Sequence, residues 1–235
     1  MEKSVKICRG RELKQKILDL LKSEDFKPAL QTIRSFPARR VINPLFALLC
    51  SMEPQVRWRA VTAVGVVVAN LAREDMESAR VIMRRMIWNL NDESGGIGWG
   101  LPEAMGEVMA RHDGLAREYV NILLSYICED GNFLEHEPLQ RGVLWGLARL
   151  AQTRPELLQQ ALPHLQPFLS SEDATLRGLA AWTIGLLDAG KAEPSLEILE
   201  GDDAEVTLYL NGTERTYLVS ELAKQAIKGI EELRD

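Results

Sequence analysis

Residues 56–67, VRWRAVTAVGVV, decide the fold, because related segments recur three more times along the chain. They are IGWGLPEAMGEV at 97–108, LQRGVLWGLARL at 139–150 and LRGLAAWTIGLL at 176–187, with successive starts 41, 42 and 37 residues apart. A period of roughly 40 residues with helical spacing inside each unit is typical of helix-pair solenoids. We therefore predict an all-α chain that forms an α-α superhelix of about five helix pairs.

Each segment carries an apolar stripe at the same offsets. Counted from the start as zero, positions 0, 4, 8 and 11 are apolar, and at about 3.6 residues per turn they share one helix face. These positions are Val56, Ala60, Val64 and Val67; Ile97, Leu101, Met105 and Val108; Leu139, Val143, Leu147 and Leu150; and Leu176, Ala180, Ile184 and Leu187. Position 9 holds Gly65, Gly106, Ala148 and Gly185. Small residues there predict a close approach of neighbouring helix backbones.

The repeated segments are expected to be the second helix of each pair. The first helices are predicted at about 44–51, 76–89, 115–128, 155–169 and 193–199, with Pro163 and Pro167 bending or ending the fourth. Two amphipathic segments at 12–21 and 28–36 precede them and lack the repeat pattern. We expect residues 1–40 to be an N-terminal helical cap, 41–201 the repeats, and 202–235 a last repeat that contains an insertion and a closing helix.

The insertion is predicted to be a small β-hairpin near the C-terminus. Residues 205–219, EVTLYLNGTERTYLV, alternate apolar and polar side chains around Asn211-Gly212, a strong signal for a two-residue turn. Because a lone hairpin is only marginally stable in water, it must pack on other elements. We expect it to cover the end of the solenoid, the alternative being that it presents a strand edge to a partner.

Composition limits the compartment and the partners. The three cysteines are far apart and form no CxxC pair, and no segment resembles a signal peptide or a membrane span, so we expect a cytoplasmic protein with reduced thiols. The net charge of −6 is divided unevenly. Residues 1–90 hold 17 Lys and Arg against 9 Asp and Glu, whereas residues 91–235 hold 11 against 25. Such an asymmetry could orient a charged partner along the molecule. The alternative is that the charged side chains are only solvated and meet no partner.

The acidic or proline residue before each segment, the VR or LR near its start and the small residues at fixed offsets resemble HEAT repeats, notably the short type of phycobilin lyases. The resemblance covers about residues 41–189 well and the last repeat loosely. The whole chain also resembles a bacterial HEAT-repeat family without an assigned activity. The resemblance implies a HEAT-like solenoid and a binding role, and it carries no catalytic residue onto this sequence.

A second stripe, at positions 2, 6 and 10, holds four of the five tryptophans. It reads Trp58, Thr62, Val66; Trp99, Glu103, Glu107; Arg141, Trp145, Arg149; and Gly178, Trp182, Leu186. The HEAT resemblance would place this stripe on the concave face. We predict that it binds a protein or peptide partner, a small molecule being possible, through Trp58, Trp99, Glu103, Glu107, Arg141, Trp145, Arg149 and Trp182.

The alternative interpretation of this stripe is packing between repeats, with Glu107 paired to Arg149 one repeat further on. The tryptophan side chains would then be buried, whereas a binding groove would leave several of them exposed. If the stripe is exposed, Trp88, on a first helix, is expected to be the protected exception.

The glycine-rich stretch at 92–109, DESGGIGWGLPEAMGEVM, is not a phosphate loop. It lacks the G-x-G-x-x-G spacing, and no lysine or serine stands where a phosphate loop needs one. Gly100 and Pro102 instead mark a helix start, with Glu103 in the first turn. This repeat is therefore predicted to begin its second helix late, after a glycine-rich lip at 95–100.

Two other classes of function remain as alternatives. Glu103, Glu107, His136 and Glu137 could hold a metal ion in a metal-dependent or lyase-type enzyme, and HEAT-like deoxyhypusine hydroxylases use repeated His-Glu pairs. Here His112 and His164 are not followed by glutamate, so we expect no metal and no cofactor. Nucleic acid could contact the basic N-terminal third, but the acidic remainder opposes it. The basic candidates are Arg39, Arg40, Arg57, Arg59, Arg84 and Arg85.

Overall fold

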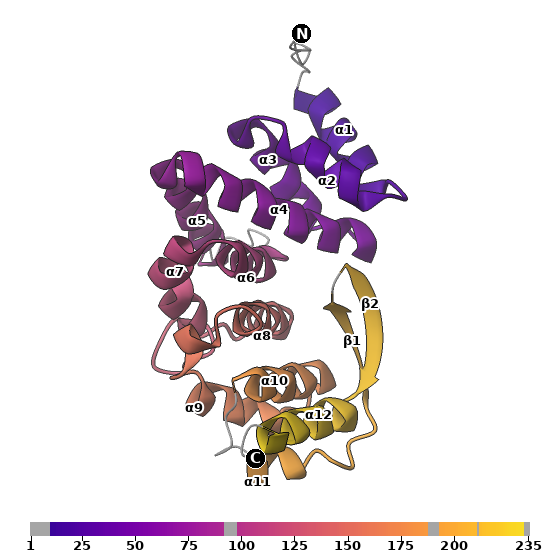
Figure 1. Cartoon of the computed structure of the whole chain (residues 1–235), viewed down its shortest axis with the longest axis vertical. Helices are drawn as coiled ribbons and strands as arrows, with labels where there is room; N and C mark the ends of the chain where they lie inside the picture. Colours follow the sequence, from indigo (N-terminus) through magenta and orange to yellow (C-terminus); the bar gives the residue numbers. More distant parts are fainter. Residues whose placement is uncertain (1–9, 92–97, 188–192, 211, 233–235) are drawn as a thin grey trace.

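The computed structural model describes residues 10–91, 98–187, 193–210 and 212–232, which form a curved α-solenoid with its helices stacked in chain order (Figure 1). The helices are α1 Gly10–Lys22, α2 Phe26–Arg34, α3 Ala38–Leu49, α4 Pro54–Glu74, α5 Met76–Leu90, α6 Leu101–Arg111, α7 Asp113–Ser125, α8 Glu137–Ala151, η1 Pro155–Leu158, α9 Leu162–Leu165, η2 Gln166–Ser170, α10 Ala174–Leu186, α11 Glu193–Glu197 and α12 Val219–Glu232. The strands are β1 Glu205–Leu210 and β2 Thr213–Leu218.

The second helices form a continuous inner layer. α4 contacts α6, α6 contacts α8, α8 contacts α10, and α10 contacts α12. The first helices α5, α7 and α9 lie on the outer side of this layer in Figure 1. α1 and α2 pack on the N-terminal end, through contacts with α3 and α4. The prediction of an all-α superhelix with a small hairpin is confirmed.

The predicted apolar stripe is the core of the inner layer. Val56, Met105, Val143 and Ile184 are fully buried, and so are nearly all other stripe residues in the described ranges. Leu139 is only half-buried because it lies in the first turn of α8. Ile97 lies outside the described residues. Burial of the stripe therefore follows the repeat pattern.

Small residues let the second helices approach one another closely. A Cβ atom added to Gly106 in α6 would lie 2.3 Å from Cα of Gly146 in α8, which is too close for any real contact. The same holds for Gly185 in α10, where an added Cβ would lie 2.6 Å from Cβ of Ala226 in α12. The backbones thus touch where the sequence predicted that they would.

Proline positions agree with the expected breaks in one place and differ in another. The helix expected to begin at Pro44 begins at Ala38 and includes Pro44. A proline inside a helix removes a backbone hydrogen bond, and burial of Leu45 and Leu49 beside it offsets that cost. The predicted break at Pro163 and Pro167 is present, since this segment consists of η1, α9 and η2 instead of one helix.

The hairpin does more than cover the solenoid end. β1 and β2 pair antiparallel from Glu205↔Leu218 to Leu210↔Thr213, around a turn in which Gly212 has φ 89°. Asn211 lies outside the described residues. β1 packs on α10 and β2 on α12, as expected, but the hairpin then extends along the inner side of the solenoid toward α4 (Figure 1). The end-cap prediction was therefore incomplete.

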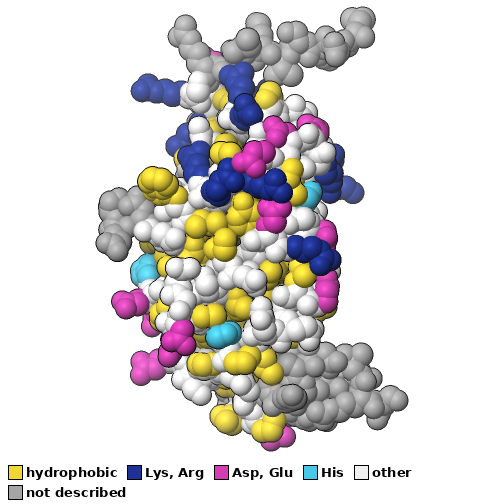
Figure 2. Space-filling model, turned by 90° about the vertical axis from the view of Figure 1, so that its left-hand side faces the viewer, with side chains coloured by type: hydrophobic (Ala, Val, Ile, Leu, Met, Phe, Trp, Pro, Cys, Tyr) yellow, Lys and Arg dark blue, Asp and Glu magenta, His cyan; other side chains and the backbone are white. Residues whose placement is uncertain are grey.

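The outer face shows the charge asymmetry of the sequence. In Figure 2, lysine and arginine side chains gather on the N-terminal half of this face, whereas carboxylates predominate below. Cys50 and Cys128 are unpaired and half-buried. Of the helices in the described ranges, none is long and apolar enough to cross a membrane.

The close contact at Gly106 yields the first prediction. Gly106→Ala should destabilise the protein by about 1–3 kcal/mol, because the added methyl group collides with the α8 backbone. Gly229→Ala is the matched control, since Gly229 lies in α12 and an added Cβ there has no atom within 4 Å. It should be neutral or stabilising by up to about 1 kcal/mol. Urea unfolding measures both, and equal effects would contradict the close helix contact.

Candidate functional site in the concave groove

The inner side of the solenoid contains a groove made of two adjoining cavities. The larger has a volume of about 450 Å³ and is lined by residues of α2, α4, α6, α8, α10 and the hairpin. The smaller, about 400 Å³, extends along α2 and α4. The two cavities share Leu30 and Arg111 as lining residues, so we call them together the concave groove.

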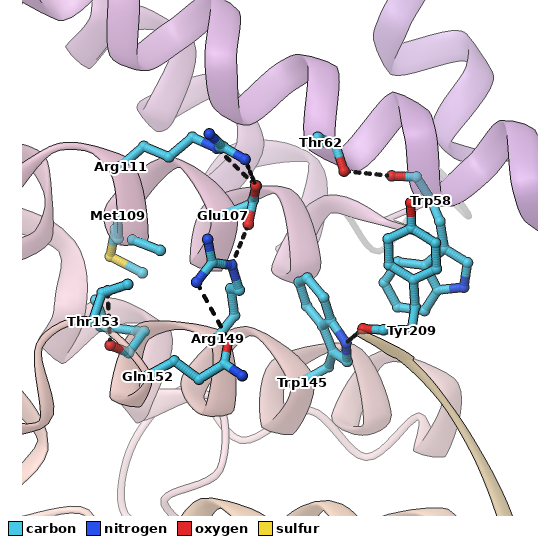
Figure 3. Close-up of polar contacts among 12 residues, drawn as sticks. Trp58, Thr62, Glu107, Met109, Arg111, Trp145, Arg149, Gln152, Thr153 and Tyr209 are labelled. Carbon is cyan, nitrogen blue, oxygen red and sulfur yellow. Dashed lines mark hydrogen bonds and ion pairs between the residues drawn. The ribbon is translucent and has the colours of Figure 1, made fainter. Parts of the chain in front are cut away.

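The hairpin closes one side of the groove by placing Tyr209 among two tryptophans. The Tyr209 ring stacks on Trp58 of α4 with centroids 4.9 Å apart and an interplanar angle of 1°. Trp145 of α8 donates a hydrogen bond from Nε1 to the Tyr209 carbonyl oxygen at 3.0 Å (Figure 3). Trp145 is only 6% exposed as a result. Two of the tryptophans predicted to bind a partner therefore bind the hairpin.

Trp58 and Trp145 meet although a complete repeat separates them in sequence. Their ring centroids are 4.9 Å apart. α4 and α8 begin two residues before the repeat starts defined above, whereas α6 begins four residues after its own start. The predicted late start of α6 is thus present. The intervening tryptophan, Trp99, lies before α6 and is 43% exposed.

Glu107 holds two arginines at the centre of the groove. Glu107 is 4% exposed, and its carboxylate accepts hydrogen bonds from Arg111 on Oε1 and from Arg149 on Oε2, the latter at 2.6 Å (Figure 3). Arg111 lies one turn further along α6, whereas Arg149 comes from α8. The ion pair expected between Glu107 and Arg149 is present. Removing one partner of such a buried ion pair typically lowers the free energy of unfolding by about 3–5 kcal/mol.

Glu103 lies one turn before Glu107 and has a different environment. Its carboxylate packs against Gly142 of α8, where an added Cβ would lie 2.6 Å from Oε2. Oε2 is buried and accepts no hydrogen bond from the described part of the chain. Burial raises the pKa of Glu103 to about 7, with Arg57 opposing the shift. This carboxyl group therefore changes its charge near neutral pH.

The remaining predicted residues are divided between the groove and its surroundings. Trp182 of α10 is half-buried and lines the groove together with Glu107, Trp145 and Arg149. Arg141 instead forms an ion pair with Asp173, the N-cap of α10, and so joins two repeats. Trp58, Trp99, Glu103 and Arg141 are not among the described residues that line the cavities.

The expectation for Trp88 was wrong. It is 73% exposed, because α5 buries Ile82, Met83, Met86 and Leu90 and this face leaves Trp88 on the outside of the solenoid. A first helix buries only the side that meets its partner, and residues 87–89 fall between the last two buried positions.

The four residues of the metal hypothesis do not come together. Glu107 pairs with arginines in the groove, Glu103 packs on Gly142, and Glu137 lines a different cavity. Within the described ranges, no group of three or more His, Cys, Asp and Glu side chains could hold a metal ion. The structure thus gives the metal hypothesis no geometric support.

The arginines of the nucleic-acid hypothesis largely serve structural contacts. Arg59 is buried and donates to the carbonyl oxygens of Leu21 and Ser23, which fixes the cap to α4. Arg84 pairs with Glu77, and Arg85 contacts Asn43 and the Phe46 ring. These side chains are already engaged and do not form one free basic surface.

Several groove residues were absent from the sequence prediction. Phe26, Lys27 and Leu30 come from α2, which lacks the repeat pattern, and Tyr209 and Leu210 come from the hairpin. Arg111 had a detectable signal, since it follows Glu107 by four residues on one helix. The approach of α2 and the hairpin to the repeats leaves no local signal in the sequence.

Comparison with known proteins supports this fold. Residues 137–187 match the family model of the HEAT-like repeat. Among solved structures, the chain is similar to a designed armadillo repeat protein in complex with the peptide (KR)4, at 19% identity and a TM-score of 0.52, over 93% of this chain and 99% of that one. It is also similar to Kap121p bound to Nup53p, at 14% identity and a TM-score of 0.57, over 94% of this chain and 24% of that one. No curated protein matches the sequence.

These matches define the class as an α-solenoid of the armadillo and HEAT type. Residues 137–187 are the part of the chain whose sequence is similar to the HEAT-like repeat. The phycobilin-lyase subtype stays a prediction.

The buried Oε2 atom of Glu103 predicts a pH-dependent stability. Its pKa of about 7 in the folded state lies above the ordinary 4.5, so the folded state keeps a proton that the unfolded state releases. The stabilisation of the folded state by this proton is fully present below about pH 4.5 and is lost as the pH rises through about 7. Glu103→Gln should remove this loss and be more stable than the native chain at pH 8, by at most about 3 kcal/mol.

Urea unfolding at pH 5 and pH 8 tests this prediction. Glu200→Gln, at an exposed residue after α11, is the control and should leave the pH profile unchanged. A Glu103→Gln profile parallel to that of the native chain would show that Glu103 is ionised throughout.

The hairpin contact predicts that Tyr209 shields the groove tryptophans. In a Trp88→Phe, Trp99→Phe background, Tyr209→Ala should shift the fluorescence emission to the red and increase acrylamide quenching. Because the buried ring is removed, the free energy of unfolding should fall by roughly 3 kcal/mol. Tyr217→Ala, on β2, is the control, because no described tryptophan ring stacks on Tyr217. An unchanged Tyr209→Ala spectrum would contradict the docked hairpin.

Proposed function

We propose that this chain is a non-catalytic HEAT-repeat scaffold that binds an acidic, partly apolar peptide segment of a partner protein in the concave groove. The observation that carries this proposal is the charge of the groove. Five cations line it, with Glu107 as the one carboxylate among the described lining residues. The cations are Lys27, Arg34, Arg73, Arg111 and Arg149.

The cations are arranged to meet a ligand. Glu107 is shared by Arg111 and Arg149, which leaves excess positive charge at the groove centre. Arg34 donates to the neutral side chain of Asn70. The side chains of Lys27 and Arg73 are exposed and have no ion-pair partner in the described part of the chain. Carboxylates of a peptide would neutralise this charge.

Apolar side chains supply the second part of the recognition surface. Phe26, Leu30, Trp182 and Leu210 line the larger cavity and are all partly exposed. Apolar area with a few placed charges is the usual lining of a ligand cavity, and partly exposed aromatic side chains often dominate binding energy. A segment that alternates acidic and apolar residues fits both features.

The solved relatives suggest the mode of binding but not the same ligand. The designed armadillo repeat protein is in complex with a peptide of lysine and arginine, and Kap121p is bound to Nup53p. The groove of the present chain is basic, so by charge complementarity its peptide should be acidic. A polyanionic nucleic acid is less compatible, because residues 91–235 carry 25 acidic against 11 basic residues.

Fluorescence anisotropy with labelled octapeptides tests the proposal. An alternating Glu-Leu peptide should bind, an alternating Gln-Leu peptide should not, and added salt should weaken binding. Lys27→Gln and Arg73→Gln should each weaken it roughly threefold to tenfold, as expected for a partly exposed charge pair. Lys224→Gln, an exposed change on α12 outside the groove, is the matched control.

Two results would overturn the proposal. Equal binding of the Glu-Leu and Gln-Leu peptides would show that the groove cations do not take part. Tighter binding of a labelled single-stranded oligonucleotide, with the same sensitivity to Lys27→Gln and Arg73→Gln, would assign the groove to nucleic acid.

A further inference from the structure

A third cavity lies apart from the concave groove. It has a volume of about 470 Å³ and is formed by the loop after α7, the first turns of α8 and the proline-containing segment α9–η2. None of its described lining residues lines the groove. We call it the acidic cavity, because its described lining includes Glu129, Asp130 and Glu137 but no lysine or arginine.

The three carboxylates lie at one cavity and form no ion pair with a cation in the described part of the chain. Elsewhere in the chain, Glu107, Asp113, Asp173 and Asp202 each form an ion pair with at least one arginine. Among the described residues, Glu129, Asp130 and Glu137 have none, and all three are exposed at the cavity. In Figure 2 the lower half of the outer face shows carboxylates beside apolar surface, and most of the cations lie higher.

Gln140 is an independent indication of a ligand. It lines the cavity and is only 6% exposed, yet its side-chain amide has no hydrogen-bond partner in the described ranges. Its amide atoms are not among the fully buried polar atoms without a partner, so the amide is accessible from the cavity. The amide oxygen of Gln140 is available to accept a hydrogen bond from a donor that enters the cavity.

The walls between these polar groups are apolar and aromatic. Ile127, Phe168 and Leu176 are buried at the cavity, and Phe133 is 37% exposed. A cation on an apolar stem would place its methylene groups against these walls and its charge near the carboxylates. A guanidinium group also stacks on aromatic rings and donates several hydrogen bonds in a plane.

We propose that the acidic cavity binds an arginine or lysine side chain of a basic peptide segment, arginine more tightly. Glu129, Asp130 and Glu137 neutralise the cation, and Gln140 accepts one of its N–H groups. A metal ion does not fit, because the described residues include no His, Cys, Asp and Glu group able to hold one. This site is independent of the groove and has the opposite charge preference, so the scaffold would hold two different segments.

An alternating Arg-Leu octapeptide is the probe, measured by fluorescence anisotropy at low salt. It should bind, an alternating Lys-Leu peptide should bind more weakly, and a Gln-Leu peptide should not bind. Asp130→Asn and Glu137→Gln should each weaken Arg-Leu binding roughly threefold to tenfold. Glu200→Gln removes the same charge from an exposed residue outside the cavity and should leave binding unchanged.

Gln140→Leu separates ligand binding from folding. Because the Gln140 amide has no partner in the described structure, this variant should melt at or above the native temperature and still bind the Arg-Leu peptide several-fold more weakly. The Glu-Leu peptide should bind Glu137→Gln as it binds the native chain, which keeps this test separate from that of the groove.

Three outcomes would overturn the proposal. The first is no binding of the Arg-Leu peptide. The second is an equal loss of binding in Glu200→Gln, which would indicate attraction to the net negative charge alone. The third is binding of free arginine methyl ester as tight as that of the peptide, which would assign the cavity to small amines.

Discussion

The close approach of neighbouring second helices is the constraint on which the rest of the structure depends. At Gly106 and Gly146 two backbones lie so near that a methyl group has no room. This spacing places Arg149 of α8 within hydrogen-bonding distance of Glu107 on α6, and Gly65 leaves the room that the Glu107 side chain occupies. The groove charge therefore originates in a backbone contact. A wider helix spacing would separate the carboxylate from its arginines and leave a buried charge without a partner.

The late start of α6 has an equally large effect on the groove. Trp58 and Trp145 meet although a repeat separates them, and the hairpin holds both: the Tyr209 ring stacks on Trp58, and its carbonyl oxygen accepts a hydrogen bond from Trp145. The hairpin thereby joins the C-terminal end of the solenoid to its N-terminal third. Part of the aromatic surface expected to bind a partner is consumed by this internal contact, so the basic and apolar remainder determines what the groove can bind.

The two proposed sites follow from where arginine is placed relative to carboxylate. Five cations and one carboxylate line the groove, and three carboxylates but no lysine or arginine are among the described residues that line the acidic cavity. Most other charged contacts between repeats are balanced, such as Arg80 with Glu118 and Arg177 with Asp202. An excess of one sign of charge around a cavity is what the two proposed sites have in common.

The repeat, the buried stripe, the small residues at helix contacts, the late start of α6 and the hairpin could all be predicted from the sequence, because each depends on residues close together in the chain. Even the Glu107–Arg149 pair follows from the repeat, because residues 42 apart occupy the same position in successive repeats and therefore lie on neighbouring helices. Only the tertiary structure decided that Tyr209 covers Trp145, that α2 lines the groove and that Gln140 faces a cavity without a partner. Each of these contacts depends on the curvature of the whole solenoid, which brings segments distant in the chain together. Contacts of this kind leave no periodic pattern in the sequence.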